Sequence, residues 1–222
     1  MHEQKELSLA RFEAQLAESR AHLGPYLDLY QIHSATAESR CLDDAALLRA
    51  LVAGRREGAY RAVGLTLSGP SSACTLELAL AARVDGERVF DAVQATFNCF
   101  EPSLAGPLAR AHDAGVGVIA KEVFANGRLT DANTLVGDTS LVRGLRAAAA
   151  ARCCSIDQLA LAFVLVHPFV DMALSGAVTT AQLASHTGAL AVTLDDDTRA
   201  LLAAMAEPPE QYWATRARLP WH

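Results

Sequence analysis

Apolar residues along the chain alternate between the spacing of helices and the two-residue spacing of strands. Over residues 8–23 they recur at helical spacing, and Ser8 stands where a helix cap is expected, so this range is predicted to form the first helix. Further helices are predicted at 43–54, from Pro70 onward, and at 104–114, 140–152, 156–167, 179–190 and 195–205. Strands are predicted at 26–32, 60–66, 89–96, 116–120 and 170–174.

Strand and helix follow one another in units mostly about thirty residues apart, which is typical of a parallel sheet covered by helices. A barrel and a doubly wound sheet both fit this order. No GxGxxG or GxxxxGK[ST] loop follows any strand, and polar residues gather just after strand ends, which favours the barrel. We therefore expect an α/β fold, a partial (β/α)8 TIM-type barrel with about five of its eight parallel strand-helix units. Residues 1–222 are expected to form one domain.

Composition narrows the class of protein. The 222 residues are 51% hydrophobic and 20% charged, and 19 basic against 25 acidic residues give a net charge of −6. This predicts a globular core, and it argues against a nucleic acid or a membrane as a partner. The start of the chain has no signal-peptide pattern, so a cytoplasmic location is expected. The five cysteines include no CxxC pair, and no metal site is predicted.

His33 is the first candidate for chemistry. Counting by twos along the strand, Leu29, Gln31 and His33 share one face, which places the imidazole at the carboxyl end of the sheet. Barrel enzymes build their sites at that end. His33 could donate a proton to a carbonyl or polarise it, or it could simply cap the strand through a hydrogen bond.

Five segments resemble the aldo-keto reductase family, in the family's order. YLDLYQIH (26–33) resembles the strand that bears the family's active-site histidine. VGLTLS (63–68) resembles its IGVSNF strand, and DAVQATFN (91–98) its DxVQxxYN strand. GVIAKEVFANGRLT (117–130) resembles its GVIAYSPLxxGxLT segment, and LSGAVTTAQL (174–183) its last strand and cofactor-binding helix. The resemblance extends from about residue 8 to about residue 205.

The resemblance implies a nicotinamide-dependent oxidoreductase acting on a small carbonyl or alcohol substrate. It also implies that the chain is a shortened member, which enters near the helix before the family's fourth strand. The family's catalytic tyrosine, lysine and aspartate belong to the three missing units, so only His33 has a counterpart. Tyr30 lies on the strand face opposite His33, and no other tyrosine matches the missing acid.

The nicotinamide end of the family's cofactor site is partly retained. The Ser-Asn pair and the Gln that hold the carboxamide correspond to Thr66-Leu67 and Gln94, so the hydroxyl remains and the asparagine amide is lost. Lys121 stands where the family has a tyrosine that stacks on the nicotinamide. A lysine cannot stack in this way, although it could pair with Glu122 or a phosphate.

The phosphate and adenosine end matches the segment around a predicted helix start, a place suited to a phosphate. Gln182 replaces an arginine that often clamps the 2′-phosphate, so a preference for NADP over NAD is not indicated. The residues implied at this end are Gly176, Ala177, Val178, Thr179, Gln182 and His186.

Two other functions stay open. The chain could be a non-catalytic relative that binds a nucleotide or a protein partner, or a lyase that uses Lys121 to form a Schiff base. If the chain is complete, the open edge of its first strand should pair with another copy, so a homo-oligomer is expected. The aromatic and basic tail from Tyr212 to His222 could cover the mouth of the barrel or pack on the surface.

Overall fold

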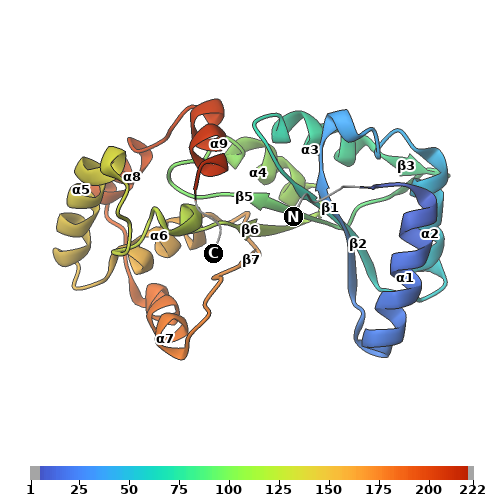
Figure 1. The fold of residues 1–222 in the computed structure, drawn as a ribbon, viewed down its shortest axis with the longest axis horizontal. Coiled ribbons are helices and arrows are strands. Elements are labelled where there is room, and N and C mark those ends of the chain that lie inside the picture. The colour runs from blue at the N-terminus through green and yellow to red at the C-terminus, as the bar shows by residue number, and fades with distance from the viewer. Residues whose placement is uncertain (1–5, 220–222) are drawn as a thin grey trace. The chain divides into compact units, whose positions relative to one another are not determined.

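The computed structural model describes residues 6–219, apart from the side chain of Val136, so Trp221 and His222 of the tail lie outside the described residues. The chain divides into two compact units: residues 1–95 with 110–117 (unit 1), and residues 96–109 with 118–222 (unit 2). Strands alternate with helices along the chain, as Figure 1 shows. None of the helices in residues 6–219 is long and apolar enough to span a membrane.

Three parallel strands form the sheet of unit 1, in the order β1 (Leu29–Ala35), β2 (Ala62–Leu67) and β5 (Ala92–Thr96). The helices of this unit are α1 (Leu9–Leu23), α2 (Ala45–Arg56) and α3 (Ser72–Ala81), and α4 (Ala105–Asp113) has residues 110–113 in unit 1 and 105–109 in unit 2. Short 3₁₀ turns cover Gly24–Tyr26 and Ala37–Ser39, and a hairpin joins β3 (Arg83–Val84) to β4 (Glu87–Arg88). The hairpin was not expected from the sequence, because its strands are two residues long.

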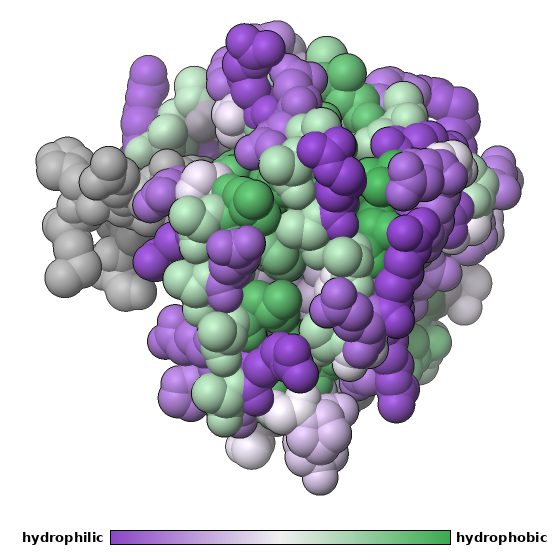
Figure 2. Space-filling view, turned by 90° about the vertical axis from the view of Figure 1, so that its right-hand side faces the viewer, coloured by the Kyte–Doolittle hydropathy of each residue, from purple (hydrophilic) through white to green (hydrophobic). Residues whose placement is uncertain are grey.

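The first helix begins as predicted. The Ser8 hydroxyl accepts the backbone N–H of Arg11, and Gly24 ends the helix with a φ of 53°, a value that glycine adopts without strain. Phe12 is the buried residue of α1, and its ring meets that of Tyr30 edge to face with centroids 5.4 Å apart. Most other residues of α1 are exposed, with Leu9, Leu16 and Ser19 half-buried. Figure 2 shows hydrophilic side chains over much of this side of unit 1 with apolar ones between them.

The two ends of the unit 1 strands differ in chemistry. At the amino end, the Asp91 carboxylate accepts from the backbone N–H of Val63, at 2.9 Å, and from the guanidinium of Arg55. Arg55 also donates to the backbone carbonyls of Arg88 and Val89. These bonds tie the strands to α2 and leave the carboxyl end of the sheet for the candidate site.

Unit 2 contains the parallel strands β6 (Gly117–Lys121) and β7 (Met172–Ala173), with Ile119 opposite Met172. Its helices are α5 (Thr139–Ala150), α6 (Ile156–Leu165), α7 (Thr180–Gly188), α8 (Asp196–Ala203) and α9 (Pro209–Ala217), and its 3₁₀ turns cover Ala125–Gly127, Val136–Asp138 and Ala189–Ala191. The predicted strand at 170–174 is therefore only two residues long, and α9 was not predicted.

The elements confirm the predicted α/β class, with boundaries that differ from the expected ones by up to three residues at most ends. The second helix was expected to open at Asp43, but Asp44 caps it, because its carboxylate accepts the backbone N–H groups of Ala46 and Leu47. The acidic run that opens α8 acts as the expected cap, since Asp195 accepts the backbone N–H of Thr198 at 2.9 Å.

Candidate functional site

β1 has an irregularity where it carries His33. Ile32 pairs with Leu65 and Ala35 with Leu67, so two residues of β1, His33 and Ser34, stand opposite the single residue Thr66. Ser34 has a φ of 52°, an uncommon value for a residue with a side chain. Its backbone N–H donates to the Thr66 hydroxyl oxygen at 2.6 Å, and its own hydroxyl lies 3.3 Å from His33 Nε2. Bulges of this kind redirect side chains next to functional sites.

The next strand extends this arrangement into a row. Thr66 is directly in register with Gln94 of β5. Thr66 is 4% exposed and Gln94 half-buried, whereas His33 is exposed. The structure thus brings three of the predicted site residues together at the carboxyl end of the unit 1 strands. We call His33, Thr66 and Gln94 the inner-face row.

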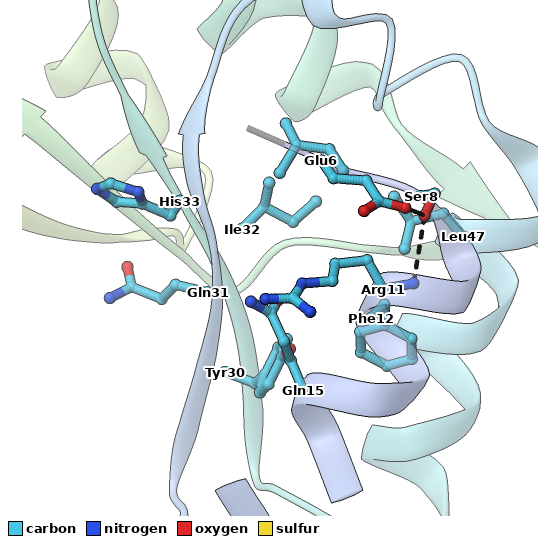
Figure 3. A pocket seen from close by; sticks show the side chains of 11 residues that line it. Glu6, Ser8, Arg11, Phe12, Gln15, Tyr30, Gln31, Ile32, His33 and Leu47 are labelled. Carbon is cyan, nitrogen blue, oxygen red and sulfur yellow. Dashed lines mark hydrogen bonds between the residues drawn. The ribbon is translucent and has the colours of Figure 1, made fainter. Parts of the chain in front are cut away.

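A pocket of about 170 Å³ lies on the other side of β1, between that strand and α1. Figure 3 shows Tyr30 and Ile32 turned toward α1, while Gln31 and His33 project from the opposite side of the strand. His33 contributes to the lining, but its imidazole points away from the space beside Arg11 and Gln15. The pocket therefore opens on the α1 side of β1, and the His33 imidazole projects from the other side of the strand.

None of the three tyrosines of unit 1 supplies a phenol to the inner-face row. Tyr30 faces α1, in agreement with the sequence analysis. Tyr60 is buried and donates its hydroxyl to the backbone carbonyl of Leu51 at 2.8 Å. Tyr26 is 83% exposed, and Tyr212 is buried in unit 2. Burial raises the pKa of the Tyr30 and Tyr60 phenols, so neither is poised to lose its proton near neutral pH.

In unit 2, the carboxyl end of β6 leads into a buried ion pair between Glu122 and Arg216, which was not predicted from the sequence. Lys121 is followed by Glu122, which has a φ of 54° and a side chain only 12% exposed. Arg216 of α9 donates to the Glu122 carboxylate through Nε at 2.9 Å and Nη2 at 2.6 Å. Burial raises the Glu122 pKa, but the Arg216 guanidinium outweighs it, so the net shift is downward. The ion pair holds α9 at the carboxyl end of β6.

Asn98 connects Glu122 with helix α9 through its side chain. Its side-chain nitrogen donates to the backbone carbonyl of Glu122 at 2.9 Å and to the Tyr212 hydroxyl at 3.2 Å. Its side-chain oxygen accepts the backbone N–H groups of Phe100 and Glu101. The Tyr212 hydroxyl donates in turn to the Glu122 carboxylate. Asn98 was visible in the sequence only as the last residue of a family-like strand, since its partners lie up to 114 positions away.

The predicted phosphate segment lies at the start of α7, where the helix already has its own cap. The amide oxygen of Gln182 accepts the backbone N–H groups of Val178 at 2.9 Å and Thr179 at 3.1 Å. The Thr179 hydroxyl accepts the backbone N–H of Gln182 in return. Gly176 has a φ of 59° and Ala177 donates its N–H to Ser175. A phosphate that used the same N–H groups would have to displace the Gln182 side chain.

His186, the last predicted residue, is 8% exposed. Its ring lies 4.4 Å from that of Phe124, centroid to centroid, and its Nε2 is 3.6 Å from the Asp157 carboxylate. Ser185 donates its hydroxyl to the same carboxylate at 2.7 Å. His186 is thus held mainly by side chains of unit 2. No cluster of three or more possible metal ligands occurs among residues 6–219.

Comparison with known proteins decides the family. The model of the "Aldo/keto reductase family" matches residues 1–207. The chain belongs to the aldo/keto reductase family. Members of this family are oxidoreductases that generally use NAD(P)H and act on small carbonyl substrates. No curated protein sequence matches the chain significantly.

Solved structures show the same fold. The holo form of aldo-keto reductase AKR11C1 from Bacillus halodurans matches with a TM-score of 0.73 and 19% identity, over 94% of this chain and 72% of that one. Its apo form matches with a TM-score of 0.71 and 20% identity, over 92% of this chain and 71% of that one. The thermostable aldo-keto reductase Tm1743, in complex with the inhibitor epalrestat, matches with a TM-score of 0.68 and 21% identity. This match covers 90% of this chain and 67% of that one. The partial barrel expected from the sequence is confirmed as a fold class.

Proposed function

We propose that the chain is a nicotinamide-dependent oxidoreductase for a small carbonyl or alcohol substrate, built as one aldo-keto-reductase-like domain. The observation that carries this proposal is the bulge in β1, which sets His33 beside the Thr66–Gln94 pair at the carboxyl end of the strands. An exposed imidazole next to a buried hydroxyl and a half-buried amide suits a site that binds a polar ring and polarises a carbonyl.

The inner-face row fits a nicotinamide carboxamide. The Thr66 hydroxyl oxygen already accepts from Ser34, so its hydrogen is left to donate. The Gln94 amide offers both a donor and an acceptor. A bound NAD(P)H would supply the hydride, and His33 would orient and polarise the substrate carbonyl. In unit 2 we propose, on the resemblance, further nucleotide contacts from Lys121, Gly176, Ala177, Val178, Thr179, Gln182 and His186.

Turnover of small aldehydes tests this function. The full chain is incubated with NADPH or NADH and a panel of aldehydes, and loss of the reduced nicotinamide is followed by absorbance. We expect slow turnover, reduced about 100-fold or more in His33→Ala, because a positioned acid-base group commonly contributes that much. His112→Ala, which changes a histidine of α4, is the matched control. Equal rates in wild type and His33→Ala would contradict the role of His33.

The placement of the tyrosines favours a second candidate, a relative that binds the nucleotide without turning over a substrate. No tyrosine of unit 1 places its phenol on the inner-face row, so within unit 1 the developing alkoxide has His33 as its proton donor. Saturable nucleotide binding with no turnover of any aldehyde would select this candidate.

The Schiff-base lyase stays a prediction. Borohydride trapping on Lys121 with a carbonyl compound tests it.

We also propose that the 222 residues by themselves form a homo-oligomer through the edge of β1 that β2 does not cover. Among the described residues, β1 pairs with β2 alone. The Asp28 carbonyl accepts the N–H of Ala62, so strand alternation turns the N–H groups of Leu29, Gln31 and His33 toward the free edge. Sedimentation at micromolar concentration should show a dimer or larger species, and a monomer would contradict the proposal.

A further inference from the structure

Gln31 has a buried oxygen with no hydrogen-bond partner. It lies two residues before His33 and projects from the same side of β1 (Figure 3). Among the residues that the structure describes, nothing donates a hydrogen bond to its amide oxygen Oε1. A buried acceptor left in this state destabilises the protein, because the oxygen has lost its hydrogen bonds to water. Such a cost inside a candidate site indicates that a ligand supplies the donor.

The neighbouring strand is shaped to hold this side chain. Gln31 is in register with Gly64 of β2, and Gly64 with Ala92 of β5. A Cβ on Gly64 would lie 2.9 Å from Gln31 Cγ and 3.1 Å from Oε1. Only glycine allows the Gln31 side chain to lie against β2 in this position. The Gln31 side chain therefore lies across the inner face, against β2.

Gln31 stands next to the inner-face row. Gly64 and Thr66 share one face of β2 and are about 7 Å apart along the strand. Leu67, which takes the place of the family's asparagine amide, belongs to the opposite face and is 1% exposed, so it can supply neither polarity nor contact there. The inner face of unit 1 thus has a hydroxyl at Thr66 and an amide that comes from a different strand.

We propose that Gln31 is a further ligand-binding residue, whose amide oxygen accepts an N–H of the nicotinamide carboxamide in place of the missing asparagine. The inference rests on the proposed function. The chemistry is complementary: a carboxamide has one oxygen and two N–H groups, Thr66 has a hydrogen left to donate, and Gln31 has an acceptor left to fill.

An analogue of the nucleotide removes the N–H donors on which this hydrogen bond depends. In the 3-acetylpyridine form of NAD⁺ or NADP⁺ an acetyl group replaces the carboxamide, so the carbonyl oxygen is kept and both N–H donors are lost. Binding of each form to the full chain is measured by calorimetry. Wild type should bind the carboxamide form about tenfold more tightly, as expected for one buried hydrogen bond. Gln31→Leu should lose most of this preference, down to what the Gln94 acceptor alone supports, and Gln31→Glu, which retains an acceptor, should keep it.

The controls separate this role from a structural one. Gln15→Leu removes an amide on the α1 side of β1 and should keep the wild-type preference. Gln31→Met, unbranched like glutamine, replaces the leucine variant if that protein melts early. Equal weakening of both nucleotides in the Gln31 variants, or no preference in wild type, would overturn the inference while leaving the proposed function intact. No binding of any nucleotide by wild type would overturn both.

Discussion

The backbone N–H of Ser34 donates to the side-chain hydroxyl of Thr66, at 2.6 Å, in the bulge that follows His33. Both residues are buried, so this bond replaces the regular main-chain pairing that the bulge interrupts. It joins the carboxyl ends of β1 and β2 and fixes the direction in which the chain leaves His33. The candidate site therefore depends on one side-chain hydroxyl of the neighbouring strand.

Replacing Thr66 by valine should destabilise the protein by about 1–3 kcal/mol, because the buried N–H of Ser34 would lose its acceptor. Valine keeps the shape, so the effect isolates the hydrogen bond. Urea unfolding at constant pH measures it. Thr66→Ser keeps the hydroxyl and should therefore lose less stability than Thr66→Val. A Thr66→Val protein as stable as wild type would show that the bond is not needed to hold the bulge.

The pair of Glu122 and Arg216 makes stability depend on pH. The Glu122 pKa is lower in the folded protein than its ordinary value of 4.5, so the pair stabilises the fold above about pH 4.5 and this stabilisation is lost as the pH falls further. Arg216→Met should cost about 3 kcal/mol at pH 7, the low end for a buried pair, because the arginine is 24% exposed. The free energy of unfolding of the Arg216→Met protein should also fall less than that of wild type between pH 5 and pH 3. Identical acid unfolding curves would contradict this account.

Glu101 should behave in the opposite way. It is 2% exposed, and among the described residues its Oε2 has no hydrogen-bond partner. Burial raises its pKa, so the folded state holds a proton that the unfolded state releases, and stability falls as the pH rises above about 4.5. Glu101→Gln removes this cost, so its melting temperature should exceed that of wild type at pH 7.5 by more than at pH 4. A larger gain at pH 4 would have the wrong sign.

Gln182→Arg should raise the preference for NADPH over NADH about tenfold. The substitution removes the amide that caps Val178 and Thr179, and it adds a cation suited to a 2′-phosphate. Loss of the cap should cost about 1 kcal/mol of stability. The ratio of the two dissociation constants, from parallel titrations, gives the result. Gln211→Arg, on the exposed surface of α9, is the matched control, and an equal change of ratio there would point to charge alone.

Local signals in the sequence were enough for most elements and for the strand face of His33, whereas Thr66 and Gln94 were predicted from the family resemblance. Ser8, Gly24 and Asp195 act at the helix ends where they were expected, because caps depend on residues a few positions away. Counting by twos also placed His33 correctly opposite Tyr30, because side chains alternate along a strand. The bulge at Ser34 breaks that alternation and has no signal in the sequence itself.

The parts that could not be predicted depend on contacts between distant residues. Asn98, Glu122 and Arg216 meet only after β6 and α9 have formed, and none of them has a distinctive local pattern. Helix α9 has Tyr212 as its one buried residue, too few for a periodic apolar stripe. Gln31 was counted on the face of His33, but its buried oxygen became evident only once Gly64 was placed beside it.

Binding of reduced nicotinamide to the inner-face row tests the central claim most directly. NADPH and NADH are titrated into the full chain while nicotinamide fluorescence is followed, and the same is done with Gln94→Leu, which removes the amide opposite Thr66. We predict saturable binding by wild type and affinity about tenfold weaker for the variant. No binding up to millimolar nucleotide, or equal binding by both proteins, would contradict the assignment of this row as the nicotinamide site.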